Sequence, residues 1–200
     1  MQCFSYRDAI NAARVRYTEN VVKNAFLEIL VKKPINKITV TEVCERAQIN
    51  RSTFYTHYSD CFEVLVVIEQ EIINDFIESL KLIKEPDETA FIMAIYTIIR
   101  QHEEACRILL FNTESRHMVD KMLDIARPVS YKKWREKLPN ISDNELEMLY
   151  THLSNGLMNV IFTGYYKYGS EEIVNFVKRM IRCSLETFSN KKGTCGSVAQ

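Results

Sequence analysis

Glycine and proline are scarce in this sequence: 200 residues contain five glycines and four prolines. Proteins built from many short strands and tight turns need both residues often, so the scarcity favours long helices over an all-β fold. At the same time, 46% of the residues are hydrophobic, which is enough to bury a substantial core. We therefore expect an all-α protein.

Long hydrophobic runs are also missing. The most apolar stretch, residues 62–83, is interrupted repeatedly by acidic side chains, so it lacks the run of about 18 apolar residues that indicates a transmembrane helix. Residues 1–16 carry charges and contain no apolar segment of the length that a signal peptide needs. These absences predict a cytoplasmic protein with no membrane partner.

The cysteines and the usual catalytic motifs give no sign of a metal centre or an enzyme. The six cysteines are scattered and no two form a C-x-x-C pair, which favours reduced thiols over a disulfide framework. His57 and Cys61 are four residues apart, but no second pair of ligands completes a zinc site. The sequence contains no G-x-S-x-G motif, no phosphate-binding loop and no paired-histidine motif. We expect no metal, no cofactor and no catalysis.

The net charge is zero, which argues against a uniformly basic protein that binds nucleic acid. Its distribution is nevertheless uneven. Residues 1–60 contain nine Lys and Arg against six Asp and Glu, an excess of three positive charges, and residues 61–200 carry an excess of three negative charges. The asymmetry points to the N-terminal part as the region that contacts phosphate.

Four polar residues that can cap a helix stand where apolar residues begin to recur at helical spacing: Thr18, Thr39, Asn50 and Asp60. Thr39 and Asp60 are each followed three residues later by a glutamate, which completes a capping box. The corresponding helices are expected over residues 18–33, 40–47, 51–57 and 61–83. Three short helices thus precede one long helix.

The later chain shows helical apolar spacing in five further segments: residues 89–101, 104–111, 115–138, 143–168 and 170–188. Pro128 is expected to kink or divide the third of these helices. The Gly, Ser and Lys content of residues 190–200 predicts a disordered tail.

Residues 38–60 carry the strongest functional signal. A turn of three residues, 48–50, joins two short helices and places the second across the first, an arrangement that fits the second helix into the major groove of DNA. Its polar face carries four candidate contacts: Arg51, Ser52, Tyr55 and Thr56. Five apolar residues are expected to face inward: Val40, Val43, Ala47, Ile49 and Phe54. Arginine can bind a guanine edge or a phosphate, and hydroxyls can fix the DNA backbone.

Residues 39–43 (TVTEV) and 49–58 (INRSTFYTHY) resemble the helix-turn-helix signature of the TetR family of transcription regulators, and the resemblance is specific over about residues 18–65. By position, it implies that Arg51 and Thr53 meet bases, that Tyr55 and His57 contact phosphates, and that Thr39 touches the DNA backbone. Two alternatives stay open, because His57 can be an ordinary surface histidine and Tyr55 can serve only in packing.

Two residues depart from the family pattern. Gln48 stands where the family usually has glycine in the turn, so the turn either adopts a left-handed residue at a cost or uses another geometry. Cys61 replaces a lysine that pairs with phosphate in many members.

Arg14 and Arg16, just before the first expected helix, either reach into the minor groove as an arm or remain solvated.

The two C-terminal helices are apolar on more than one face, which implies a second partner. The family resemblance implies that they pair across a two-fold axis as a four-helix bundle, and a dimer can present two reading helices to a palindromic operator. The expected interface residues are Leu153, Gly156, Leu157, Val160, Ile161, Val177 and Ile181. The alternative is a purely intramolecular core.

Aromatic and methionine side chains are frequent on the middle helices, where they either line an apolar effector pocket or form ordinary core. The candidates are Phe91, Tyr96, His102, Phe111, Met118, Met122, Tyr131 and Trp134.

These features predict an N-terminal arm and DNA-binding domain over residues 1–60, followed by a regulatory and dimerisation domain over 61–189. The expected function is a DNA-binding transcription regulator, a repressor, that binds a palindromic operator as a homodimer and responds to a small-molecule effector. The alternative is a helical protein-interaction module that retains the helix-turn-helix shape without operator binding. Arg51 and its neighbouring hydroxyls favour the first reading, because a helix that no longer reads DNA has no need of such donors.

Overall fold

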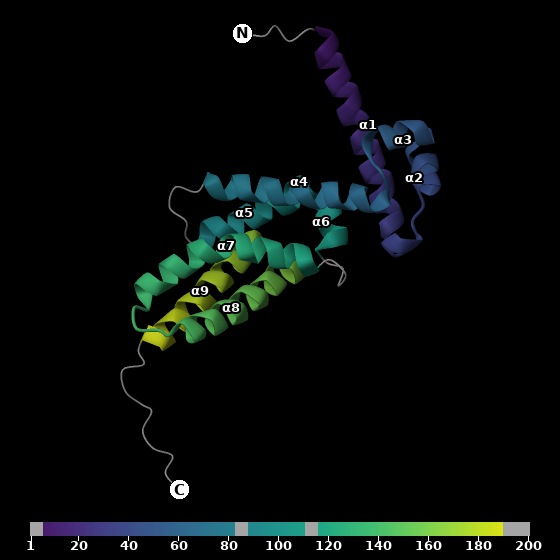
Figure 1. Ribbon diagram of the computed structural model, residues 1–200. Coiled ribbons are helices and arrows are strands. Elements are labelled where there is room, and N and C mark those ends of the chain that lie inside the picture. Colours follow the sequence, from purple (N-terminus) through teal and green to yellow (C-terminus); the bar gives the residue numbers. More distant parts are fainter. Residues whose placement is uncertain (1–5, 83–87, 111–115, 190–200) are drawn as a thin grey trace. The chain divides into compact units, whose positions relative to one another are not determined.

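The computed structural model describes residues 6–82, 88–110 and 116–189, and within these ranges it contains nine α-helices, one short 3-10 turn and no strand (Figure 1). The helices are α1 (Tyr6–Leu30), α2 (Val40–Ala47), α3 (Arg51–His57), α4 (Cys61–Lys81), α5 (Glu88–Gln101), α6 (Glu103–Leu109), α7 (Arg116–Lys137), α8 (Asp143–Gly164) and α9 (Ser170–Ser189), with the 3-10 turn at Ile35–Lys37. The all-α prediction is confirmed. None of these helices is long and apolar enough to span a bilayer. The tail expected over 190–200 lies outside the described residues.

The described chain divides into two compact units. One contains residues 6–74 and 104–108, and the other contains residues 75–103 and 109–189, so the long helix α4 contributes to both. The functional boundary expected at residue 60 stays a prediction, because compactness does not define function.

Helix α1 begins at Tyr6, twelve residues before the start expected from Thr18. Thr18 is not an N-cap: its hydroxyl donates to the carbonyl of Arg14 at 3.0 Å, one turn earlier inside the helix. A threonine hydroxyl can bond either to the amides that follow it or to the carbonyl four residues back, and here it makes the second kind of bond. Arg14 and Arg16 therefore lie on a helix rather than on an extended arm before it.

Helix α2 begins with the expected capping box. Thr39 accepts a hydrogen bond from the amide of Glu42, and the Glu42 carboxylate accepts one from the amide of Thr39 at 3.0 Å. Lys33, just after α1, also donates to Glu42. These bonds from Lys33 and Thr39 lower the pKa of Glu42 to about 2.

The turn between α2 and α3 uses the left-handed geometry. Gln48 has φ 53° and ψ 41°, and the amide of Ile49 reaches back to the carbonyl of Cys44 at 3.0 Å. This is the hydrogen-bond pattern that usually has glycine at the left-handed position. Asn50 then caps α3 as expected, accepting from the amide of Thr53 at 2.7 Å.

The start of α4 differs slightly from the expected box. Asp60 accepts from the amide of Glu63 at 2.8 Å, but Glu63 reaches back to the amide of Ser59 rather than to that of Asp60. Cys61, the first residue of α4, is buried, and burial raises the pKa of its thiol to about 11.

The second unit is built mainly from α5, α7, α8 and α9, with α7 and α9 packing on α8 and α5 packing on α9. Helix α7 continues on both sides of Pro128, so the proline does not divide it. Tyr150 on α8 is buried and donates to the carbonyl of Leu123 on α7 at 2.6 Å. Burial of this hydroxyl raises the pKa of Tyr150 to about 12.

Helix α8 starts at its capping box of Ser142 and Glu145 and ends at Gly164, four residues before the expected end. A Cβ on Gly164 would lie 2.8 Å from Cδ1 of Ile173 on α9. The glycine at 164 therefore permits close packing of α9 within the same chain. At Gly156, by contrast, no atom beyond the neighbouring helix backbone lies within 4 Å of that position.

Candidate functional site

Helix α3 exposes a polar face because one aromatic residue anchors its opposite face. Phe54 is fully buried, and its ring lies 5.7 Å from the ring of Tyr58. Val43 and Ala47 of α2 are buried in the same unit, as the sequence predicted. The exposed residues on the other side of α3 are Arg51, Ser52, Tyr55 and Thr56.

Arg51 and Tyr55 form a pair on this face. Nη2 of Arg51 donates to the Tyr55 hydroxyl at 3.2 Å, and the guanidinium carbon lies 5.8 Å from the centre of the ring. Arg51 forms no ion pair with any described carboxylate. Its charge is therefore available for an anionic or polar partner. The Tyr55 hydroxyl is the acceptor in this bond, so its own proton remains available as a donor.

Three other hydroxyls on α3 already use their protons locally. Ser52 and Thr53 donate to Oδ1 of Asn50 at 2.6 and 2.9 Å, and Thr56 donates to the carbonyl of Ser52 at 2.9 Å. Phosphate oxygens are acceptors and need donors. In this arrangement these residues offer acceptors rather than donors, so Arg51 and Tyr55 are the principal donors on α3.

Two further predicted DNA contacts also take part in internal bonds. The side chain of His57 is 12% exposed, and its Nδ1 lies 3.5 Å from Oε1 of Glu19 on α1. Thr39 donates its hydroxyl proton to the Glu42 carboxylate at 2.7 Å within the capping box. His57 therefore connects α3 to α1, and Thr39 stabilises the start of α2.

Ion pairs separate the basic residues of this unit into two groups. Lys23, Lys33 and Arg46 are paired with Glu71, Glu42 and Glu28. Besides Arg51, five others are exposed and form no ion pair with the residues that the structure describes: Arg14, Arg16, Lys32, Lys37 and Arg107. The sequence reading did not single out Lys32 and Lys37, which precede α2. Their lack of an acidic partner is visible only in three dimensions.

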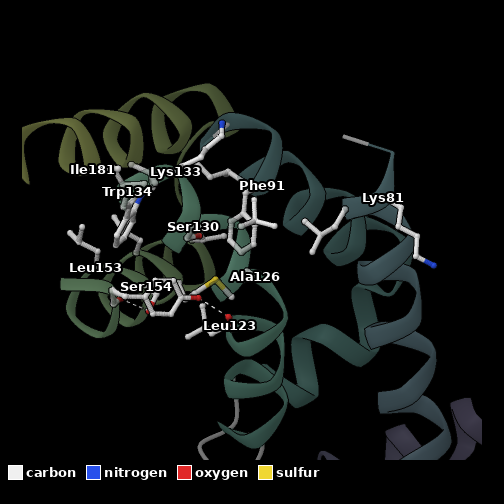
Figure 2. Close-up of a pocket in the computed structure, with 18 residues that line it drawn as sticks. Lys81, Phe91, Leu123, Ala126, Ser130, Lys133, Trp134, Leu153, Ser154 and Ile181 are labelled. Atoms are coloured by element: carbon white, nitrogen blue, oxygen red, sulfur yellow. Dashed lines mark hydrogen bonds between the residues drawn. The ribbon is translucent and has the colours of Figure 1, made fainter. Parts of the chain in front are cut away.

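The second unit contains a cavity of about 370 Å³. Its walls come from α4, α5, α7, α8 and α9, and most of the side chains that line it are apolar (Figure 2). A cavity of this size and lining is typical of small-molecule sites.

The predicted effector residues are only partly brought together. Phe91 and Trp134 line the cavity, and Phe111 lies outside the described residues. The others are not on the wall: Tyr96, His102, Met118, Met122 and Tyr131. Met118 and Met122 are core residues, Tyr131 donates to Glu147, and His102 bonds to Asp75 at 2.7 Å.

Five of the residues predicted for a dimer interface line this same cavity: Leu153, Leu157, Ile161, Val177 and Ile181. Leu157 is half-buried, and the other four are buried within the single chain. Of the remaining two, Gly156 is exposed and Val160 is half-buried. As an intersubunit contact, the set stays a prediction.

No protein-family model matches the chain. A curated relative, the uncharacterized HTH-type transcriptional regulator YxbF of Bacillus subtilis (strain 168), is 30% identical over 98 residues, which cover 48% of this chain and 24% of that protein. The match thus spans about a quarter of the relative's length.

Solved structures share the fold over nearly their whole length. A TetR transcriptional regulator from Streptococcus agalactiae 2603V aligns with a TM-score of 0.60 and 18% identity, covering 86% of this chain and 98% of that chain. The dihydroxyacetone kinase operon activator DhaS aligns with a TM-score of 0.52 and 16% identity, covering 86% and 97%. A TetR-family regulator from Syntrophomonas wolfei strain Goettingen aligns with a TM-score of 0.53 and 13% identity, covering 86% of this chain and 96% of that chain. The chain therefore has the fold of TetR-family regulators, and the resemblance seen in the sequence is confirmed for the fold.

Proposed function

We propose that this chain is a DNA-binding transcription regulator of the TetR type, which reads an operator with α3, acts as a homodimer and responds to a small molecule in the cavity of its second unit. One observation carries the DNA-binding part. Arg51 is exposed at the first position of the second helix of a helix-turn-helix and has no acidic partner among the described residues. That end of the helix faces base edges in helix-turn-helix complexes.

Exposed donors on α3 and elsewhere in the same unit support contacts to the DNA backbone as well as to bases. Tyr55 retains a hydroxyl proton for a phosphate oxygen, and Lys32 and Lys37 carry exposed charges without acidic partners in the described chain. Backbone contacts of this kind fix the position of a protein on the duplex, whereas base contacts specify sequence. We assign Arg51 to bases and these three residues to phosphates.

A homodimer is proposed because one reading helix recognises only one half-site, and two-fold symmetry matches a palindromic operator. Exposed apolar side chains on the last two helices offer a surface for it: Met148 is 63% exposed, Phe176 37% and Met180 39%. Since Leu153, Ile161 and Val177 are buried inside the chain, we place the interface on Met148, Phe176 and Met180 together with Gly156 and Val160.

We propose repression rather than activation because repression requires fewer molecular contacts. A dimer on its operator blocks access to that DNA, whereas activation requires an additional contact with the transcription machinery. A ligand then changes DNA affinity only if it binds the two conformations of the protein unequally.

Capture of genomic fragments by the purified protein, followed by sequencing, tests the proposal. The wild-type chain should enrich fragments that share a palindromic sequence, and Arg51→Ala should lose that enrichment. Arg100→Ala is the matched control, because Arg100 is an exposed arginine of the second unit with no ion pair among the described residues. A folded protein that enriches no sequence would contradict operator binding and favour the alternative, a protein-interaction module.

A further inference from the structure

The polar groups on the cavity wall are unevenly distributed. Ser130, Lys133 and Trp134 all come from α7 and line the cavity at spacings of three and four residues, so they form one stripe on one helix face. Most of the remaining wall is apolar, with Phe91, Leu157 and other side chains from α5, α8 and α9. We call Ser130, Lys133 and Trp134 the donor stripe.

The polar groups of the donor stripe have no hydrogen-bond or ion-pair partner in the described chain, although the Trp134 ring lies 5.8 Å from that of Tyr150. The ammonium of Lys133, the hydroxyl of Ser130 and the indole N–H of Trp134 make no hydrogen bond or ion pair with any residue that the structure describes. Each of these groups can donate, and lysine and the indole N–H can only donate. A ligand that satisfies the stripe must therefore present acceptors.

The other polar groups on the wall are already satisfied. Lys81 pairs with Glu78 at 2.7 Å. Tyr150 donates to the carbonyl of Leu123, and Ser154 donates to the carbonyl of Tyr150 at 2.6 Å. Lys133 is thus the cation on the described wall that lacks a counter-ion.

The charge of the wall selects the sign of the ligand. No aspartate or glutamate is among the described residues that line the cavity. Figure 2 shows Lys133 at the edge of the lining side chains with its nitrogen directed outward, so its charge lies at the rim while its stem borders the apolar interior. This arrangement suits a molecule with an anionic head and an apolar body.

The volume limits the size of the apolar body. A cavity of about 370 Å³ holds roughly a dozen groups the size of a water molecule, at about 30 Å³ each. A carboxylate with an unbranched chain of about ten carbons has that size.

We propose that the cavity binds an amphipathic carboxylate of medium chain length, with the carboxylate at Lys133 and Ser130 and the chain against Phe91 and Leu157. Charge-assisted hydrogen bonds from Lys133 compensate the carboxylate for the water it loses. The binding itself is independent of DNA. Only its regulatory consequence rests on the proposed function.

The chain contains a single tryptophan, and it is Trp134 in the donor stripe. Its fluorescence therefore reports binding directly. Decanoate should change the emission and saturate. Methyl decanoate has a similar chain but no charge, and it should bind roughly tenfold more weakly or worse, as expected for the loss of one charge-assisted bond. Decylamine, with the opposite charge, should bind more weakly than both.

Variants of Lys133 test the assignment residue by residue. Lys133→Met should weaken decanoate by roughly tenfold and leave methyl decanoate unchanged, and Lys133→Arg should retain the preference for the acid. Lys132→Met is the matched control, because Lys132 is the adjacent exposed lysine and does not line the cavity. Circular dichroism establishes that each variant is folded. Equal affinity for acid and ester, or full decanoate affinity in folded Lys133→Met, would overturn the proposal.

Adding decanoate to the protein–operator complex separates the two proposals. Saturating binding of decanoate supports the ligand assignment even if no operator is found. Decanoate that binds without changing operator affinity also supports it, and contradicts only the regulatory role. Operator binding without any response of Trp134 to decanoate overturns the ligand assignment and leaves DNA binding intact.

Discussion

Arg51 and Tyr55 lie one turn apart on α3, with Nη2 of the arginine 3.2 Å from the tyrosine hydroxyl oxygen. The hydroxyl accepts this bond, and the guanidinium retains further N–H donors. The same pair thus combines a group suited to base edges with one suited to phosphate, and the two functions respond differently to sequence and to salt.

Arg51→Ala should weaken operator binding selectively. If Arg51 binds a guanine through two hydrogen bonds, its loss should reduce affinity by roughly ten- to a hundredfold and relax the preference at one position in each half-site. The slope of log affinity against log salt should stay nearly unchanged. Fluorescence anisotropy on operator and scrambled duplexes across a salt series measures both effects. Equal losses on both duplexes with a slope flattened by about one would reassign Arg51 to a phosphate.

Tyr55→Phe should weaken all DNA sequences alike. The change removes one hydrogen bond from a neutral hydroxyl to a charged phosphate, so we expect a loss of roughly tenfold or more on operator and scrambled duplexes. The double variant Arg51→Ala/Tyr55→Phe measures how strongly the two residues depend on each other. A loss confined to the operator would show that Tyr55 acts through the orientation of Arg51.

Local signals in the sequence predicted much of the helix-turn-helix, α2 and α3. The bounds of α2 and α3 match the prediction because each helix begins at a residue whose side chain caps it, Thr39 and Asn50. The start of α1 was missed because the hydroxyl of Thr18 bonds backward to a carbonyl, and the residue type alone does not distinguish that bond from a cap. The internal bonds of Ser52, Thr53 and Thr56 were missed for the same reason.

The second unit was less predictable because its contacts join helices far apart in the sequence. Apolar periodicity predicted that Leu157 and Val177 lie on packed helix faces. It does not show whether such a face packs on another helix of the same chain or on a partner subunit. The sequence did not predict a role for Lys133, because lysines are common on the exposed faces of amphipathic helices. Its position on an apolar cavity depends on the packing of α5, α8 and α9 around α7.

Acid should remove a stabilising contribution of Glu42. The folded pKa is about 2 against an ordinary 4.5, so the unfolded chain takes up the proton first as the pH falls. The contribution is fully present above pH 4.5 and is lost between pH 4.5 and 2. Urea unfolding across this range should show Glu42→Gln less stable than wild type at neutral pH, with the difference shrinking as the pH falls. Glu45→Gln, on an exposed face of the same helix, controls for the loss of an acidic charge. A difference that is constant with pH would contradict the role of the carboxylate.

Phe176→Glu should split the proposed dimer. The side chain is 37% exposed on α9, and burying an unpaired carboxylate in an apolar interface is costly. Light scattering should give twice the chain mass of 23.4 kDa for wild type at micromolar concentration and the single mass for the variant. Met93→Glu, at an exposed apolar residue of α5 outside the proposed interface, should remain dimeric. A wild-type monomer, or a Phe176→Glu dimer of unchanged stability, would remove α9 from the interface.

Gln48→Gly should stabilise the protein. Gln48 holds φ 53°, the left-handed region, where a residue with a Cβ is strained by about 1–2 kcal/mol and glycine is not. Glycine also gives the unfolded chain more freedom, which costs about 0.4–1 kcal/mol in the opposite direction. The free energy of unfolding should therefore rise by roughly 0.5–1 kcal/mol, the difference between these two effects. Gln48→Ala keeps the Cβ and its strain, so it should change stability little, because the Gln48 side chain is exposed and makes no hydrogen bond in the described chain. Urea unfolding of the three proteins compares them directly. A glycine variant less stable than wild type would show that the freedom of the unfolded chain outweighs the strain in this turn.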